Sequence, residues 1–426
     1  MSAPAREPKN AAKRFETASV SNPIANEERT SKDSIVDIDA RGDLILCISH
    51  DATATVHVHR FRVSSGQLKA TSKYFSGLLQ GRFGESEQVG AKHVELRKQY
   101  DNIGDVPAAE LPIVRIDDIG RISAVKSIEA LCTDFLSILH DLDTPPLPPV
   151  TNIANWAIVA DRFDALTAVG SYVRRKKMLR AIDGKTAPKV DLALSEEKIR
   201  QRLLVAILLD YPPWTEKYSL RMVVKGWIDR EIDETSALWW DLPMQIEEEL
   251  AHRRYCILET IQSLEHHFIK LYTSRERQCR LGYDSSAQCD SFQLGEMVRF
   301  FSRIGTASVR GTILDDAAPS EPFQGDLNVL IDLLKQAPEY QIDSFHHHCG
   351  LRTKLIPLLD MVNECLAHVG ICQECWSQAR VEHSWMDTKK PLLWRRQLLR
   401  LRTPVHQELH NNVRAVFTAV DRDWSA

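Results

Sequence analysis

The sequence predicts an α+β fold, in which a small sheet with helices comes first and a mainly α-helical domain follows. Three observations lead to this prediction. Short runs rich in β-branched residues gather at 35–38, 44–48 and 55–63. After residue 64 the apolar residues change from alternating to helical spacing. From Ser195 almost to the end of the chain, the pattern is that of successive helices.

The first three β-type runs are separated by turn signals. Asp39–Asp43, which contains Gly42, is typical of a turn between the first two runs. His50–Asp51 is expected to separate the second run from the third. We therefore expect a β-hairpin with one further strand. A short helical pair follows, indicated by apolar residues at helical spacing and ended at 77–81: Leu68, Phe75, Leu78 and Leu79.

The rest of the first domain is predicted from its turn-forming residues and from the spacing of its apolar residues. Residues 99–109 are typical of a loop insertion, and Pro112–Ile116 is expected to return a strand to the sheet. Ile128–His140 carries an amphipathic stripe and predicts a helix. Four prolines within 144–149 indicate a stiff connector, although such a run also suits a proline-binding partner. Thr151 or Asn152 can cap a further helix that runs through Trp156 and Val159. Leu166–Tyr172 is the expected last helix of this domain.

At these residues the sequence resembles the BTB/POZ domain, in the divergent form common in fungal proteins. The resemblance covers residues 34–177 and rests on separated pieces that occur in the family's order: Asp43–Leu46, Phe61–Ser65, Leu68 with Ser72–Phe75, Leu136–His140, and Ala157–Phe163. The sequence departs from many family members at Ser64, where they carry a histidine. The second half, with a Leu-Pro before Arg253–Arg254, resembles the helical C-terminal half of such proteins more loosely.

The resemblance implies a protein–protein interaction module that works by homo- or hetero-association. Some family members recruit cullin-type ubiquitin ligases, so a ligase substrate adaptor or a regulatory scaffold is the implied role. The matching surface here would lie near the helical pair, at Tyr74, Leu78, Leu79 and Phe83. Phe75 is expected to belong to the core.

Composition sets limits on the class of protein. Of 426 residues, 43% are hydrophobic and 26% are charged, which is ordinary for a globular protein. The net charge of -4 gives no general attraction to nucleic acid. The apolar runs are too short for a membrane span. Nine cysteines, scattered unevenly, favour a reducing compartment over a disulfide framework, so we expect an intracellular protein, cytoplasmic or nuclear.

The expected organisation is a disordered tail at 1–33, the BTB/POZ-like domain at 34–177, a linker at 178–192 and a helical domain at 193–420. The longest periodic element spans about 244–272. Its stripe suits a core-facing helix or a coiled-coil seam, and Arg254 interrupts it.

Two basic clusters have alternative interpretations. Arg174–Lys177 suits a nuclear-import or phosphate-binding patch, or the solvated end of a helix. Leu392–Arg402 suits a nucleic-acid or anionic contact, or a terminal helix with its leucines packed on the core.

Cysteine and histidine gather in the last third of the chain. Cys279 and Cys289 flank a polar loop, and His346 and Cys349 have the spacing at which two ligands chelate one ion. This set predicts a structural zinc site. Cys372 and Cys375, with the same spacing, are alternatives to either pair. The other interpretation is that the cysteines fill the core and the histidines begin a solvated helix.

Motifs for catalysis are missing from the sequence. It has no G-x-S-x-G elbow, P-loop, H-E-x-x-H helix or G-x-G-x-x-G turn. We therefore expect no enzymatic activity, and the structural zinc is the one cofactor that the sequence suggests. The main alternative to the interaction module is a nucleic-acid-associated regulator with a zinc-stabilised helical domain. An enzyme in the helical half is the remaining hypothesis.

Overall fold

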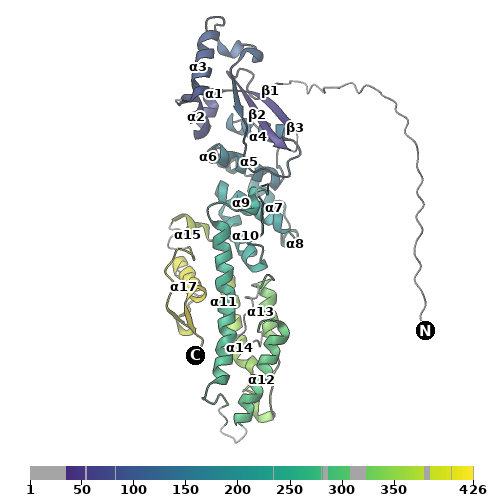
Figure 1. The fold of residues 1–426 in the computed structure, drawn as a ribbon, viewed down its shortest axis with the longest axis vertical. Coiled ribbons are helices and arrows are strands. Elements are labelled where there is room, and N and C mark those ends of the chain that lie inside the picture. The colour runs from purple at the N-terminus through teal and green to yellow at the C-terminus, as the bar shows by residue number, and fades with distance from the viewer. Residues whose placement is uncertain are drawn as a thin grey trace, which may run out of the picture.

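A computed structural model describes residues 35–52, 55–81, 83–233, 235–279, 281, 286–307, 323–378, 384–403 and 405–425. The disordered tail expected at 1–33 lies outside these residues. A small sheet with surrounding helices forms one end of an elongated molecule, and a helical body forms the rest (Figure 1). The predicted α+β class with a mainly helical second part is confirmed.

The sheet has the strand order β1-β3-β2-β4. Its strands are β1 (Ile35–Asp37), β2 (Leu44–Ala52), β3 (Thr55–Val63) and β4 (Ile113–Ile116). β2 and β3 form an antiparallel hairpin, while β1 runs parallel to β3 and β4 runs parallel to β2. The returning strand was thus predicted correctly.

The expected break at His50–Asp51 is wrong. These two residues belong to β2, where His50 pairs with His57 and Asp51 pairs with Val56. Cross-strand pairing satisfies backbone N–H and C=O groups whatever the side chain. A polar residue can therefore extend a strand when its neighbour is already in place.

The predicted turn at Asp39–Asp43 is present and packs closely against the end of β3. The Gly42 N–H donates to the Asp39 carbonyl at 2.8 Å. A Cβ at position 42 would lie 2.5 Å from the Val63 carbonyl oxygen, so the turn requires glycine by close approach. Arg62 is buried beside it and donates to the carbonyls of Gly42 and Val106. It thereby ties the sheet to the 99–109 segment.

The described residues between Ser65 and Arg175 form six helices: α1 (Ser65–Thr71), α2 (Lys73–Gln80), α3 (Gly84–Leu96), α4 (Ile128–Leu139), α5 (Val150–Arg162) and α6 (Leu166–Arg175). α1, α2, α4, α5 and α6 were predicted, and Gly81 caps α2 as expected. α3 was not predicted, because it buries only Val89 and Leu96 and so carries a weak stripe. The expected 99–109 loop contains two short 3₁₀ turns, Ile103–Asp105 and Ala108–Glu110.

Helices also occupy the expected linker at 178–192. α7 (Met178–Lys185) and α8 (Pro188–Leu192) lie there, and Met178 and Leu179 are buried. α5 and α6 pack directly against α9 (Glu196–Leu209). One continuous hydrophobic core therefore runs from the sheet into the helical body.

The basic cluster Arg174–Lys177 lies at the end of α6. Arg175 pairs with Asp141, and Lys176 pairs with Asp143. These partners support the interpretation of this cluster as a solvated helix end.

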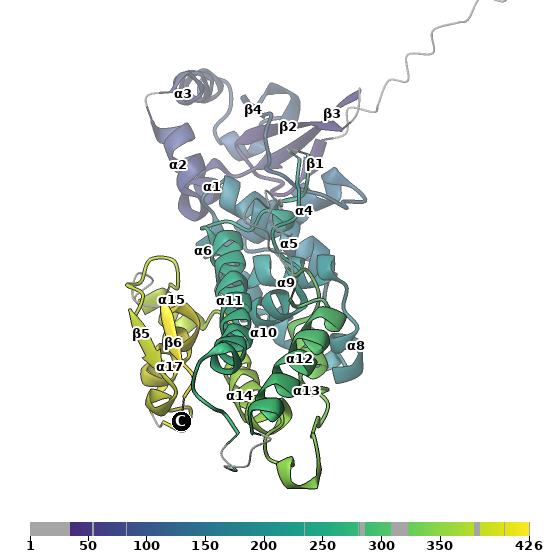
Figure 2. The same ribbon diagram turned by 60° about the horizontal axis from the view of Figure 1, so that its bottom comes forward.

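The helical body is arranged around α11 (Ile246–Thr273). α12, α13 and α14 lie on one side of α11, and α15, α17 and a two-stranded parallel sheet lie on the other (Figures 1 and 2). The remaining elements are α10 (Pro212–Lys225), α12 (Ser286–Ile304), α13 (Leu327–Lys335), α14 (Leu351–Leu366), α15 (Gln373–Gln378), α17 (His406–Thr418), β5 (Leu393–Arg395), β6 (Asp421–Asp423), and 3₁₀ turns at Leu238–Trp240, Ser344–His346 and Arg396–Leu398.

α11 is a core-facing helix. Its stripe is buried at Leu250, Ile257, Ile261, Leu264 and Phe268. Arg254, which interrupts the stripe, is also buried and donates to the carbonyls of Val223, Phe323 and Gly325. Within the described residues, no helix is both long and apolar enough to cross a membrane.

The terminal helix expected within Leu392–Arg402 is wrong. This segment instead forms β5 and a 3₁₀ turn. Trp394 is buried and meets Trp424 edge to face, with ring centroids 5.2 Å apart. Pairing with β6, at the far end of the chain, decides the conformation over the local helical pattern.

Candidate metal centres and docking residues

Three of the four predicted zinc ligands come together near the C-terminal end of α11. Cys279 lies in the loop after α11, Cys289 in the first turn of α12, and Cys349 directly before α14. Their sulfur atoms all lie within 4.8 Å of one another, and the Cys279 and Cys349 sulfurs are 3.8 Å apart. None of these cysteines forms a disulfide. We call Cys279, Cys289 and Cys349, together with the neighbouring His346, the three-cysteine centre.

His346, the fourth predicted ligand, is buried beside this group, but its ring nitrogens are not among the ligand atoms that lie within 4.8 Å of one another. Its Nδ1 lies 2.8 Å from Asp343 Oδ1, and its Nε2 is buried without a hydrogen-bond partner. The Asp343 carboxylate raises the pKa of His346, and Cys279 adds to this effect. A histidine that bonds a carboxylate through one nitrogen and keeps the other free has the usual arrangement of a zinc ligand.

Burial and hydrogen bonding together give Cys279 and Cys289 different pKa values. Burial raises the pKa of Cys289 to about 12. Burial acts in the same direction on Cys279, but hydrogen bonding from Ser286 and the Leu281 backbone outweighs it and lowers the pKa. A divalent cation would deprotonate coordinating thiols outright. The cluster is therefore suited to hold a metal through its sulfurs.

The backbone around the three-cysteine centre is fixed by hydrogen bonds. Asp290 accepts the N–H groups of Gln278 and Cys279, both at 2.9 Å. The Tyr272 hydroxyl donates to the Cys349 carbonyl at 3.1 Å. The end of α11 and the starts of α12 and α14 are thus held together independently of any bound ion.

Cys372 and Cys375 do not join this centre. They lie at the start of α15 in a separate cluster with His406 and His410, one turn apart on α17. The ligand atoms of all four residues lie within 4.8 Å of one another. The alternative in which this cysteine pair replaces Cys279/Cys289 or His346/Cys349 does not match this arrangement. We name the new group the two-histidine centre.

Sulfur and nitrogen are close in the two-histidine centre. His406 Nε2 lies 3.2 Å from the Cys372 sulfur and 3.3 Å from the Cys375 sulfur. The rings of His406 and His410 are 4.4 Å apart. Both cysteines are buried, His410 is half-buried and His406 is exposed. Burial raises the pKa of Cys375 to about 12, with a further contribution from Cys372.

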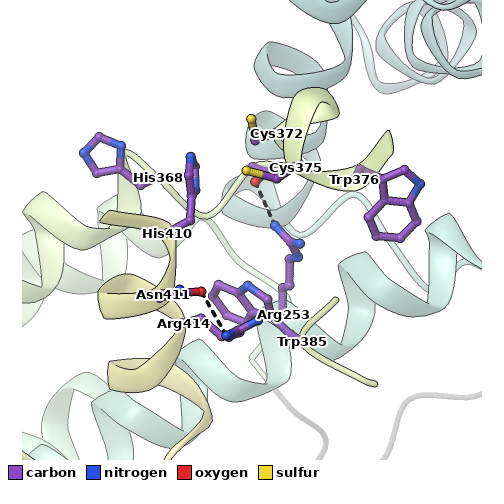
Figure 3. A pocket seen from close by; sticks show the side chains of 10 residues that line it. Arg253, His368, Cys372, Cys375, Trp376, Trp385, His410, Asn411 and Arg414 are labelled. Atoms are coloured by element: carbon purple, nitrogen blue, oxygen red, sulfur yellow. Dashed lines mark hydrogen bonds between the residues drawn. The ribbon is translucent and has the colours of Figure 1, made fainter. Parts of the chain in front are cut away.

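A small cavity of about 20 Å³ adjoins this centre. In Figure 3, His410 projects from α17 toward Cys372 and Cys375, and Arg253 lies beneath them against Trp385. Arg253 donates to the Gly370 carbonyl at 2.7 Å, and its guanidinium carbon lies 5.0 Å from the Trp385 ring centre. The centre therefore lies against a buried layer formed by Arg253 and Trp385, which joins α11 to the C-terminal segment.

His406 and His410 were not among the predicted ligands. The available signal was a C-x-x-C pair followed by two histidines with three residues between them. The long separation between the pairs, compared with that of familiar zinc motifs, hides this signal.

The predicted docking residues have different environments. Leu79 is buried, and Tyr74 and Leu78 are half-buried against the core. Phe83 is 57% exposed at the start of α3. Phe75 is buried, as expected. Among the four predicted residues, Phe83 thus offers the largest apolar side chain to a partner.

Comparison with known proteins gives no relative: no family model, curated protein or solved structure matches the chain.

Proposed function

We propose that this protein is an interaction scaffold. Its first part, residues 34–177, is a BTB/POZ-like module that docks another polypeptide, and its helical body is stabilised by zinc at Cys279, Cys289, His346 and Cys349. Four protein ligands would close the coordination sphere, which is typical of a structural site.

One observation carries the proposal for the first part. The sequence pieces that resemble the family, though far apart in the chain, meet in space. Ser72 caps α2 and donates its hydroxyl to the Phe163 carbonyl at 2.6 Å. Phe75 stacks on Phe163 with ring centres 5.1 Å apart. These contacts join the Ser72–Phe75 and Ala157–Phe163 pieces.

A second contact of the same kind lies between the hairpin and α1. Asp43 accepts the backbone N–H and the hydroxyl of Ser65, both at 2.7 Å. The Asp43–Leu46 and Phe61–Ser65 pieces therefore position α1 and, through it, α2. This gives the resembling residues a common physical role, which is to hold the α1–α2 pair against the sheet.

Exposed apolar side chains on this part support a docking role. Phe83 and Val94 are each 57% exposed, and Ile113 on the edge strand β4 is 53% exposed. The apolar area that these side chains leave in water is available for burial against a partner. The nucleic-acid alternative has less support, because Arg175 and Lys176 are already paired with aspartates.

The test compares the full-length chain with Phe83→Ser and Leu192→Ser. Leu192 is 73% exposed on α8 and provides a matched apolar control outside the proposed surface. Light scattering over the micromolar range reports self-association, and affinity purification with mass spectrometry reports other partners. We expect Phe83→Ser to lose the association and Leu192→Ser to retain it.

The same experiment distinguishes the finer roles. A cullin retained by the wild type and lost from Phe83→Ser supports a ligase adaptor, and a dimer lost in the same way supports a homodimeric scaffold. Equal association and equal partners for all three chains would overturn the proposed surface.

A further inference from the structure

We propose that Cys372, Cys375, His406 and His410 bind a second zinc ion, which clamps the C-terminal segment 384–425 onto the helical body. This centre is separate from the three-cysteine centre, and nothing in the proposed docking function requires it.

The interatomic distances match a tetrahedral ion. Zinc bonds of about 2.3 Å to sulfur and about 2.0 Å to nitrogen place neighbouring ligand atoms about 3.5 Å apart. The His406 nitrogen lies 3.2 Å and 3.3 Å from the two sulfurs. All four ligand atoms fall within 4.8 Å. The four side chains therefore already converge on the volume of one ion.

Local structure brings the two cysteines together, and likewise the two histidines, so that each pair can chelate one ion. Cys372 precedes α15, and the Trp376 N–H donates back to its carbonyl at 2.9 Å, which turns both sulfurs to one side. His406 and His410 are four residues apart on α17, so they share one face of the helix. Two sulfurs with two imidazoles at tetrahedral corners form a donor set that is typical of zinc.

Core filling explains the cysteines but not the histidines. A buried cysteine is an ordinary small apolar group. One thiol–imidazole hydrogen bond would account for a single contact, but His406 Nε2 lies close to both sulfurs, at 3.2 Å and 3.3 Å, as expected for ligands around one ion. A second histidine, His410, lies one turn away and also has a ring nitrogen within 4.8 Å of both sulfurs. Its position supports a metal site independently of His406.

The bound ion would close a long loop. It would join the start of α15, which packs on α10, to the start of α17, which packs on α11. Closing such a loop removes conformational freedom from the unfolded chain, and the free energy of metal binding adds to the stability of the folded state. The C-terminal segment would thus be held at two places, at this ion and at the buried layer around Arg253.

Elemental analysis of the full-length chain tests the proposal. We expect two zinc ions per wild-type chain and one in the double variant His406→Ala/His410→Ala. Cys279→Ser should also retain one, because it removes the other centre. His368 lines the same cavity but is not in the ligand set, so His368→Ala should retain both.

The variant His406→Cys keeps a metal ligand at position 406, so it tests the site even if the double alanine variant misfolds. His406→Cys should retain the second ion. When cobalt replaces zinc, this variant should show stronger thiolate-to-metal absorption than the wild type, because three sulfurs replace two. Circular dichroism checks that each variant is folded.

Two results would overturn the second centre. One is a wild-type chain whose zinc content does not change in the folded double variant. The other is a cobalt spectrum that His406→Cys leaves unaltered. In the first case, a fall in zinc content that occurs in Cys279→Ser but not in the double variant would assign the bound zinc to the three-cysteine centre. Both results are independent of whether Phe83 mediates docking.

Discussion

Glu249 and Arg253 form a buried ion pair one turn apart on α11, with Arg253 Nε 2.8 Å from Glu249 Oε1. Glu249 also accepts the Ser384 hydroxyl at 2.7 Å and the Trp385 N–H at 2.9 Å. Arg253 donates to the carbonyls of Val369 and Gly370. One pair on α11 therefore fixes both the chain before α15 and the start of the C-terminal segment.

We expect Glu249→Ala to destabilise the protein by about 3–5 kcal/mol, because it leaves the Arg253 charge buried without its partner. Denaturant unfolding measures this change. Burial raises the Glu249 pKa, but Arg253 and the donors at 384 and 385 outweigh it and lower that pKa, so the carboxylate stays charged. The exposed neighbour provides the control, and Glu248→Ala should shift stability by about 0.5 kcal/mol or less. Equal effects of the two variants would contradict the role of the pair.

Glu265 should make stability decrease as the pH rises. Burial raises its pKa from 4.5 to about 7, against a smaller opposing effect of Thr306. Between these pH values the folded state holds a proton that the unfolded chain has released. The free energy of unfolding should therefore fall by about 3 kcal/mol across this window and stay level above it.

Glu265→Gln, which imitates the protonated acid, should remove this contribution. The difference in unfolding free energy between the wild type and this variant, measured from pH 4.5 to 8, isolates it from other titrating groups. The exposed Glu248→Gln should leave the wild-type pH dependence unchanged. A parallel pH profile for wild type and Glu265→Gln would show that the buried carboxyl is not the cause.

Asp343→Asn should weaken zinc binding at the three-cysteine centre by about 10–100-fold, since Asp343 orients the His346 ring through Nδ1. Competition with a chelator at constant pH measures the affinity. His347, exposed and next to His346, is the matched control, and His347→Ala should keep the wild-type affinity. If both variants bind alike, His346 is not oriented for a metal.

Gly42→Ala should destabilise the protein by about 1–3 kcal/mol, because the added Cβ would lie 2.5 Å from the Val63 carbonyl oxygen in the sheet. Gly90, inside α3, has open space around it. Gly90→Ala should instead stabilise by about 0.5–1 kcal/mol through helix propensity. Thermal unfolding of both variants provides the comparison, and a neutral Gly42→Ala would show that the turn can relax.

Features that depend on near neighbours in the chain were predictable. The turn at Gly42, the end of α2 at Gly81 and the stripe of α11 follow from local backbone freedom and periodicity. The three cysteines of the first centre were also identified from residue type and spacing. The turn, the helix end and the stripe are decided within a few residues or within one repeating pattern, whereas the meeting of Cys279 with Cys349, 70 residues later in the chain, depends on tertiary packing.

Tertiary structure decided the rest. Pairing with partner strands carried β2 through His50–Asp51 and made a strand of Leu393–Arg395 despite its helical pattern. Packing of α15 and α17 on the central helical body brought Cys372 and Cys375 to His406 and His410. Local spacing specifies which residues can form a pair, but only the packing of distant helices determines which pairs meet, because that choice is made by the burial of a shared core.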